Sequence, residues 1–441
     1  MVKETLESIA SGGDEIVAAL LAGGREKLPV GGVEAYGDVP VIAGDDPVAE
    51  LDRFLAETMV DRVVDLSDEP VLDYRNRHRL AAVSLYRGVA YGGADFLFLP
   101  PPRPRVARKP TIAVIGTGKR TGKTAVCGFV ARTLVAHGLR PVIVAMGRGG
   151  PADPEVVRGD QIELTPQDLV KLADAERHAA SDYIEDAVMS RVPTVGCRRC
   201  GGGLAGGVEH SNVAAGVEVA NELPGDLILL EGSGASIPPV HADVTILVAP
   251  ASLDPEYLAG YMGPYRLLLA EFAVVTMCEN PFGSPSQVSS IAALFRDAYR
   301  PVAREGSTEE IRLVRTVFRP TPTSSVEGAT VFVATTAPEA GGEAIRRHLE
   351  GDHGCRVMGM SHSLADRSRL ELDMQDLEGK ADTLLVEIKA AGIDVATRRA
   401  LDAGLRVVYM DNTPVAVDGE DPGEMAIAAA RRAVARFEAS A

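Results

Sequence analysis

One continuous run of residues is better suited to chemistry than any other part of the chain: Gly116-Thr117-Gly118-Lys119-Arg120-Thr121-Gly122-Lys123-Thr124. In such a glycine-rich turn, backbone N–H groups converge on phosphate oxygens, the last lysine reaches the terminal phosphates, and the threonine hydroxyl ligates Mg²⁺. The apolar run 112–115 precedes the turn, and apolar residues at helical spacing follow it. The positive end of the helix dipole would then face the phosphates. The pattern predicts a P-loop that binds ATP with Mg²⁺ through residues 116–124.

This loop is longer than the common P-loop. Thr117 stands five positions before Gly122, where the first glycine is expected, and Gly116 lies one position earlier. Lys119 and Arg120 place two additional positive charges inside the loop. The pattern Gly-Thr-x-x-x-x-Gly-Lys-Thr resembles the loop of dethiobiotin synthetase and the related amide synthases. The alternative interpretation, a glycine-rich turn without a ligand, does not account for the intact Gly-Lys-Thr.

Two acidic residues are candidate magnesium ligands beside Thr124. Glu231 ends the apolar run 227–230 and is followed by Gly-Ser-Gly. A carboxylate at the carboxyl end of a buried strand, next to a P-loop, can hold Mg²⁺ or orient a water molecule. The alternative interpretation is a strand-end acid that caps a turn, and the metal site is favoured over it. For the second carboxylate, Asp160 is favoured over Asp153. The expected metal site is therefore Thr124, Glu231 and Asp160.

Arginines in glycine-rich surroundings are candidate phosphate ligands. Arg148 follows the apolar run 141–146 in a turn rich in glycine, on the sheet edge that would carry the P-loop. Arg198 and Arg199 precede Gly201, Gly202 and Gly203, which offers cationic forks and free backbone N–H groups together. Such a segment can form a concave anion-binding nest. A solvated arginine or a plain glycine loop is the alternative in each case.

Cys197 and Cys200 flank the two arginines and suggest two other kinds of site. A structural zinc site needs a second pair of ligands at matching spacing, and the sequence has none. A thioredoxin-type redox pair needs the start of a helix, and three glycines make a poor one. Anion binding is the favoured interpretation, with cysteine chemistry left open.

Three further groups of residues are weaker candidates. Asn280 follows the apolar run 273–277, where this nucleotide-binding superfamily places a residue that contacts the base. No Asn-Lys-x-Asp occurs, so guanine specificity is not indicated. Lys389, just after the run 383–388, would point toward the ligand or into solvent. Residues 73–79 hold three arginines, which usually form a solvated or ion-paired helix face; a substrate or interface role is the lesser alternative.

The elements that must position these residues form an α/β protein. A proline-rich stretch, residues 100–110, separates a small α/β unit from a region that alternates strands with helices. Near-continuous Val/Ile/Leu runs predict buried parallel strands at 112–115, 141–146, 227–230, 244–249 and 273–277. A further α/β unit has strands expected at 331–335, 383–388 and 405–410. We expect a central P-loop NTPase domain with a mostly parallel sheet, residues 106–325. N-terminal (1–105) and C-terminal (326–441) Rossmann-like α/β domains would flank it.

Composition excludes several classes of protein. The 441 residues carry a formal net charge of −17, so a nucleic-acid or anionic-membrane partner is not expected. No apolar run is long enough to span a bilayer, and residues 1–4 begin no apolar signal segment, which predicts a cytoplasmic location. The five scattered cysteines do not form a disulfide framework.

Four motifs together resemble one family, cyclic 2,3-diphosphoglycerate synthetase. They are the loop 116–124, Arg148-Gly149-Gly150-Pro151, His178-Ala179-Ala180-Ser181-Asp182, and Gly196-Cys197-Arg198-Arg199-Cys200-Gly201-Gly202-Gly203. The loop alone indicates only the wider P-loop superfamily. The segment Arg-Arg-Cys-Gly-Gly-Gly is what makes the chain resemble this one family within it. The resemblance extends over the whole chain, including the segments before the proline-rich stretch and after residue 325.

The resemblance implies that ATP closes 2,3-diphosphoglycerate into a cyclic pyrophosphate, with release of ADP and phosphate. It implies Lys123 and Mg²⁺ on the γ-phosphate, and Lys119 and Arg120 on the transferring or substrate phosphate. Arg148, Arg198 and Arg199, with the three glycines and Lys389, would bind the substrate. We also expect a homodimer, although no residue pattern specifies the oligomeric state.

Two other classes of function share this loop. An ATP-dependent ligase of the dethiobiotin or cobyrinate type would activate a carboxylate, which requires fewer cations. A nucleotide-driven metallochaperone or partitioning switch would hold a metal between subunits through Cys197 and Cys200. Partition-type ATPases carry their additional lysine five positions before the P-loop lysine. Here Lys119 is four positions before Lys123, which argues against that class.

Overall fold

The computed structural model describes residues 2–23, 38–175, 179–301, 310–375 and 380–440. The chain divides into two compact units. The first contains residues 1–101 together with 254–270 and 293–311, and the second contains the remainder. The division into domains 1–105, 106–325 and 326–441 stays a prediction, because the compact units are drawn along different boundaries.

The first unit is built from short strands and a helical layer. Its elements are α1 (Val2–Ser11), β1 (Ala19–Leu20), β2 (Val41–Ile42), α2 (Pro47–Glu57), β3 (Arg62–Val64), α3 (Tyr74–Tyr86), β4 (Ala90–Gly92), β5 (Leu97–Phe98), α8 (Glu256–Ala259) and α9 (Gly263–Leu269). Two of the three arginines in the cluster 73–79 are ion-paired, as expected for such a cluster. Arg75 pairs with Glu256, and Arg77 Nε lies 2.7 Å from Asp65 Oδ2.

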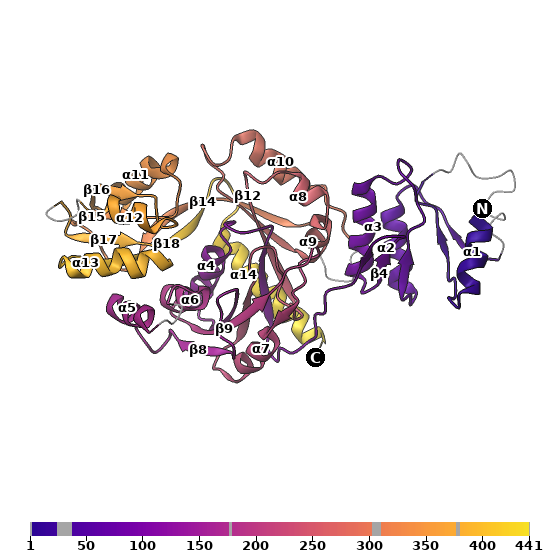
Figure 1. Cartoon of the computed structure of the whole chain (residues 1–441), viewed down its shortest axis with the longest axis horizontal. Coiled ribbons are helices and arrows are strands. Elements are labelled where there is room, and N and C mark those ends of the chain that lie inside the picture. The colour runs from indigo at the N-terminus through magenta and orange to yellow at the C-terminus, as the bar shows by residue number, and fades with distance from the viewer. Residues whose placement is uncertain (1, 24–37, 176–178, 302–309, 376–379, 441) are drawn as a thin grey trace. The chain divides into compact units, whose positions relative to one another are not determined.

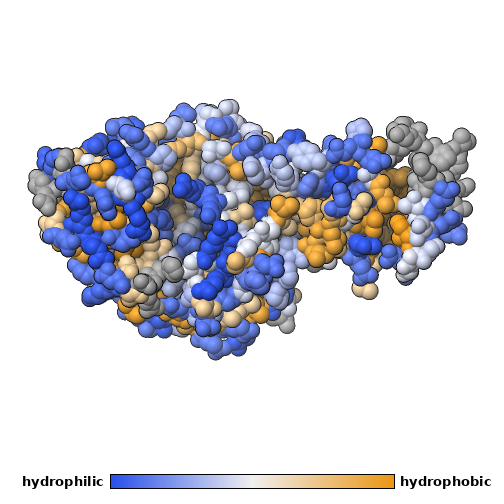
Figure 2. Space-filling view, viewed as in Figure 1, coloured by the Kyte–Doolittle hydropathy of each residue, from blue (hydrophilic) through white to orange (hydrophobic). Residues whose placement is uncertain are grey.

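Large apolar side chains are exposed on the first unit, including Met59, Leu97 and Leu99. Apolar patches on its surface are visible in Figure 2. Individually exposed apolar residues are ordinary on protein surfaces. Of the helices in the described part of the chain, none is both long and apolar enough to cross a membrane.

One large sheet organises the second unit. Its strands are β6 (Thr111–Gly116), β7 (Pro141–Gly147), β8 (Glu155–Arg158), β9 (Pro193–Cys200), β10 (His210–Ser211), β11 (Leu227–Glu231), β12 (Val244–Pro250), β13 (Phe272–Thr276), β14 (Arg312–Pro322), β15 (Thr330–Ala334), β16 (Arg356–Ser361), β17 (Thr383–Val386) and β18 (Arg406–Ala416). They run in the order β10-β9-β7-β11-β6-β12-β13-β14-β18-β17-β15-β16, with β8 paired to β9. The expected α/β class with a mostly parallel sheet is confirmed.

Neighbouring strands are parallel from β9 to β14, and the sheet then continues into the C-terminal part of the chain. The antiparallel pair β14–β18 joins the two halves, from Thr316 opposite Ala416 to Pro322 opposite Met410. In Figure 1 the strands β15, β16, β17 and β18 lie together beside α11 (Gly342–Asp352), α12 (Arg367–Asp373) and α13 (Arg398–Asp402). The strands of the P-loop region therefore share one sheet with the strands after residue 325.

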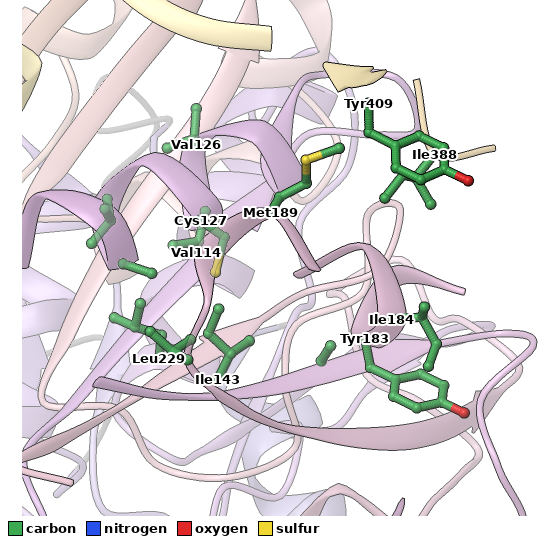
Figure 3. Close-up of a cluster of buried hydrophobic side chains, with 14 of the residues drawn as sticks. Val114, Val126, Cys127, Ile143, Tyr183, Ile184, Met189, Leu229, Ile388 and Tyr409 are labelled. Carbon is green, nitrogen blue, oxygen red and sulfur yellow. The ribbon is translucent and has the colours of Figure 1, made fainter. Parts of the chain in front are cut away.

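The helices around the P-loop strands are α4 (Lys123–Ala136), α5 (Pro166–Asp174), α6 (Asp182–Ser190), α7 (Val213–Glu222) and α14 (Pro422–Ser440). Helix α10 (Pro285–Arg296) begins among residues of the second unit and ends among those of the first. A buried apolar core joins β6, β7 and β11 to α4 and α6, and includes Val114, Cys127, Ile143, Met189 and Leu229 (Figure 3). This core holds the carboxyl ends of the strands at one edge.

Candidate active site

A cavity of about 580 Å³ lies at the carboxyl ends of the parallel strands. Its walls come from the P-loop, the turn after β7, residues 179–183 at the start of α6, the end of β9, and the turn after β11. Residues 390–394 and Arg367 complete it from the C-terminal part of the chain. Ligands of open α/β sheets bind at this edge. We call this space the P-loop cavity.

The conformation of the P-loop depends on Gly122 and on hydrogen bonds that Lys123 donates within the loop. Gly122 has φ of +90°, and a Cβ there would lie 2.3 Å from a ring atom of Phe318, so a larger residue does not fit. Helix α4 begins at Lys123, directly after it. Lys123 Nζ donates hydrogen bonds to Gly118 O at 2.7 Å and Thr121 Oγ1 at 3.3 Å. Burial lowers the pKa of Lys123. The amine of Lys123 is thus hydrogen-bonded to two uncharged oxygens of the loop, which the phosphate oxygens of a bound nucleotide would replace.

The candidate metal ligands Thr124 and Glu231 are in direct contact. Thr124 Oγ1 donates a hydrogen bond to Glu231 Oε1 at 2.6 Å. Glu231 is buried, and its second oxygen, Oε2, accepts no hydrogen bond from any residue that the structure describes. Hydroxyl and carboxylate oxygens are suitable Mg²⁺ ligands, and a buried oxygen without a donor is one that a cation would satisfy. These residues fit a magnesium ion.

Further carboxyls lie close to Glu231. Burial, and then the charge of Asp182, raise the pKa of Glu231 to about 8. Asp182 lines the cavity, and burial raises its pKa as well. Burial, and then the charge of Glu231, raise the pKa of Asp186 strongly. Burial of these neighbouring acids favours their protonated forms when no cation is bound.

Asp160 is not brought to this cavity. Its two carboxylate oxygens accept hydrogen bonds from Arg158 Nε and Nη2, at 2.8 and 2.6 Å. Asp182, the first residue of α6, borders the cavity together with Glu231. The sequence did offer a signal for Asp182. It closes the run 178–182 that supports the family resemblance, although His178 itself lies outside the described residues.

Unpaired cations line the P-loop cavity. Lys119, Arg120 and Arg148 border it, and none of them forms an ion pair within the described ranges. Arg199 also borders it and is buried. Its Nη1 donates to Gly201 O at 2.9 Å and its Nη2 to Ser233 O at 3.0 Å, while Nε has no partner. In a protein of net charge −17, such a concentration of unpaired positive charge predicts an anionic ligand.

The structure separates the two adjacent arginines. Because side chains alternate along β9, Arg199 faces the cavity whereas Arg198 is exposed and donates from Nε to Gly150 O at 2.9 Å. Gly201, Gly202 and Gly203 do not border the cavity, and the Gly203 N–H donates to Gly207 O at 2.9 Å. The nest expected from 201–203 is not formed toward this cavity. Its place is taken by the guanidinium of Arg199.

Of the remaining candidates, Cys197 borders the cavity, whereas Cys200, Lys389 and Asn280 do not. Cys197 is buried, with its pKa raised to about 12 by burial, and Cys200 is exposed. The part of the chain that the structure describes contains no cluster of acids, histidines and cysteines able to hold a metal ion by itself. Lys389 Nζ contacts both carboxylate oxygens of Glu185, at 2.8 and 2.6 Å. Asn280 is exposed in the turn after β13. Roles for Asn280 and Lys389 stay predictions.

A glycine-rich turn between β6 and α4, with a buried acid at the end of β11 in contact with its threonine, defines a P-loop protein of the nucleotide-binding class. The chain belongs to the cyclic 2,3-diphosphoglycerate synthetase family. Models of the N-terminal, P-loop and C-terminal domains of that synthetase match residues 1–99, 111–303 and 322–413.

Relatives and one solved structure were also found. A cyclic 2,3-diphosphoglycerate synthetase of Rubrobacter xylanophilus is 47% identical over 91% of this chain and 88% of its own. That of Methanothermobacter thermautotrophicus is 42% identical over 98% and 93%. A crystal structure of LpxK from Aquifex aeolicus in complex with ATP is 14% identical, covers 75% of this chain and 90% of its own, and has a TM-score of 0.42. The family matches confirm the resemblance and the prediction of a synthetase.

Proposed function

We propose that this chain closes 2,3-diphosphoglycerate into its cyclic pyrophosphate at the P-loop cavity, with Mg-ATP as the energy source. One observation carries the proposal. Lys119, Arg120, Arg148 and Arg199 border the same cavity as Lys123, Thr124 and Glu231. A nucleotide-binding loop and additional, unpaired cations are therefore combined in one space, as a reaction between ATP and a second highly charged anion requires.

The charge of the two ligands explains the number of cations. When two phosphate dianions approach to about 4 Å, they contain four pairs of unit charges. Each pair repels by roughly 1 kcal/mol in water and several times more in a protein cleft. A carboxylate substrate would carry less charge and require fewer cations. The unpaired Lys119, Arg120 and Arg148 therefore favour the diphosphate over the carboxylate-activating alternative.

The proposed reaction has two steps. An oxygen of one substrate phosphate bonds to the γ-phosphorus of ATP, and the bond between that phosphorus and the bridging oxygen breaks, so that ADP leaves. An oxygen of the other substrate phosphate then bonds to the phosphorus of the activated phosphate. Inorganic phosphate is expelled and the ring closes. Both steps depend on in-line positioning and neutralisation of charge, with no covalent bond to the protein.

Each residue has a defined task in this scheme. Lys123 would exchange Gly118 O for an oxygen of the γ-phosphate, and Lys119 and Arg120 would neutralise the phosphoryl group in transfer. Arg148 and Arg199 would hold the substrate phosphates. Thr124, Glu231 and Asp182 would hold Mg²⁺, which when bound supplies positive charge to the ATP phosphates. Asp182 stands here in place of Asp160, whose carboxylate is held by Arg158.

The two neighbouring arginines of β9 provide the test. Replacing Arg199 with alanine should raise the concentration of 2,3-diphosphoglycerate needed for half-maximal ADP release. Loss of one to two charge-assisted hydrogen bonds costs about 1.5–3 kcal/mol, which corresponds to about 10- to 150-fold. Arg198→Ala is the matched control and should behave as the wild type, because Arg198 is exposed and does not border the cavity. Equal effects of the two substitutions would refute the assigned substrate site.

A further inference from the structure

The C-terminal part of the chain contributes its own cation to the P-loop cavity. Arg367, at the start of α12, borders the cavity together with Ile393 and Asp394 of the segment 392–397. These residues lie far along the sequence from the P-loop, yet they belong to the same compact unit. Part of the cavity wall is thus built by a segment of the chain that has no phosphate-binding motif.

The guanidinium of Arg367 is only partly occupied by hydrogen bonds to the described residues. Arg367 Nη1 is hydrogen-bonded to Asp394 Oδ2. Its Nε and Nη2 have no hydrogen-bond partner within the described ranges, and its side chain is 55% exposed. A guanidinium carries five N–H donors in a rigid fork, so that one contact with Asp394 leaves a second edge available for an oxyanion.

Asp394 is placed to orient this guanidinium. Its side chain is 28% exposed, and its second oxygen, Oδ1, is buried with no donor. An arginine that is already held by one carboxylate loses less side-chain entropy when it binds an anion. The nearby Lys389, which was the cation expected from this part of the chain, instead places its amine against both oxygens of Glu185.

We propose that Arg367 binds a phosphate of the substrate and that Asp394 is its positioning residue. The inference rests on the proposed function and extends it, because it assigns part of the substrate site to the C-terminal part of the chain. A substrate phosphate in the cavity would then be bound by Arg367 of the C-terminal part of the chain in addition to the cations Lys119, Arg120 and Arg148, which border the same cavity.

The experiment measures binding of 2,3-diphosphoglycerate to the full-length protein by calorimetry in the absence of ATP. Arg367→Gln should weaken binding by about tenfold or more and leave the affinity for Mg-ATP unchanged. Arg369→Gln is the matched control, since Arg369 lies on the same helix, is 66% exposed, and pairs with Asp373 outside the cavity wall. Asp394→Asn should weaken binding less, and the double variant should be no worse than Arg367→Gln alone, because Asp394 acts through Arg367.

The possible results separate two failures. If the wild type does not bind 2,3-diphosphoglycerate, the proposed function is refuted, and with it this assignment. If the wild type binds and Arg367→Gln binds equally well, only the assignment is refuted. A loss of affinity for both ligands, together with a lower melting temperature, would give Arg367 a structural role and would also overturn the proposal.

Discussion

Replacing Lys123 with alanine will reduce the rate of ADP formation by about 100- to 1,000-fold, since removal of one preorganised donor to a transferring group has effects of this size. Within the described ranges, the hydrogen bonds of Lys123 Nζ are to Gly118 O and Thr121 Oγ1. Those contacts stabilise the loop itself, and we expect the melting temperature to change little. Rates should be measured by ADP release at saturating ATP and substrate.

A lysine outside the cavity gives the control for this experiment. Lys171 is 76% exposed on α5, where it pairs with Asp168 at 3.5 Å. Lys171→Ala should retain the wild-type rate. If Lys123→Ala also retained it, the P-loop would have no part in the reaction, and the assignment of ATP to this cavity would be wrong.

Replacing Glu231 with glutamine will reduce turnover by roughly 100-fold or more, because charge stabilisation by a metal is worth several kcal/mol in phosphoryl transfer. Glutamine keeps the shape of the side chain and can still accept from Thr124, but it lacks the negative charge that holds Mg²⁺. The Mg²⁺ concentration for half-maximal activity should rise. Glu218→Gln, at an exposed position of α7, is the control and should change neither quantity.

The pH dependence of stability gives a second measurement on the same variant. Burial raises the pKa of Glu231 to about 8, above that of an unfolded glutamate. Between these two values the folded protein binds more protons than the unfolded chain. The free energy of unfolding of the metal-free wild type should therefore fall as pH rises from about 5 to about 8. Glu231→Gln should show a smaller fall, whereas an unchanged or steeper slope would mean that Glu231 is ionised in the metal-free protein.

The local part of the site could be predicted from the sequence. The P-loop directly follows a buried strand, and Glu231 ends another. Both can be identified in the sequence from an apolar run followed at once by a glycine-rich turn. The strands expected at 112–115, 227–230 and 244–249 are confirmed by β6, β11 and β12. Their almost continuous burial on both faces is why the sequence shows unbroken apolar runs there.

The remaining walls of the cavity depend on long-range packing, which no short pattern records. Arg198 and Arg199 can be told apart only once β9 is known to be a strand whose side chains alternate. Asp182 borders the same cavity as Glu231 because α6, which it begins, packs beside α4 and the strands. Arg367 lies in a helix without any motif, and it borders the cavity only because the sheet continues through β14 and β18.

The most direct test of the account follows the phosphorus atoms themselves. The purified protein, Mg-ATP and 2,3-diphosphoglycerate should be incubated together and observed by ³¹P nuclear magnetic resonance. The account predicts that the two phosphomonoester resonances of the substrate disappear and that pyrophosphate resonances of a cyclic product appear, with one ADP and one inorganic phosphate formed for each ring. Formation of ADP and phosphate with the substrate resonances unchanged would contradict it.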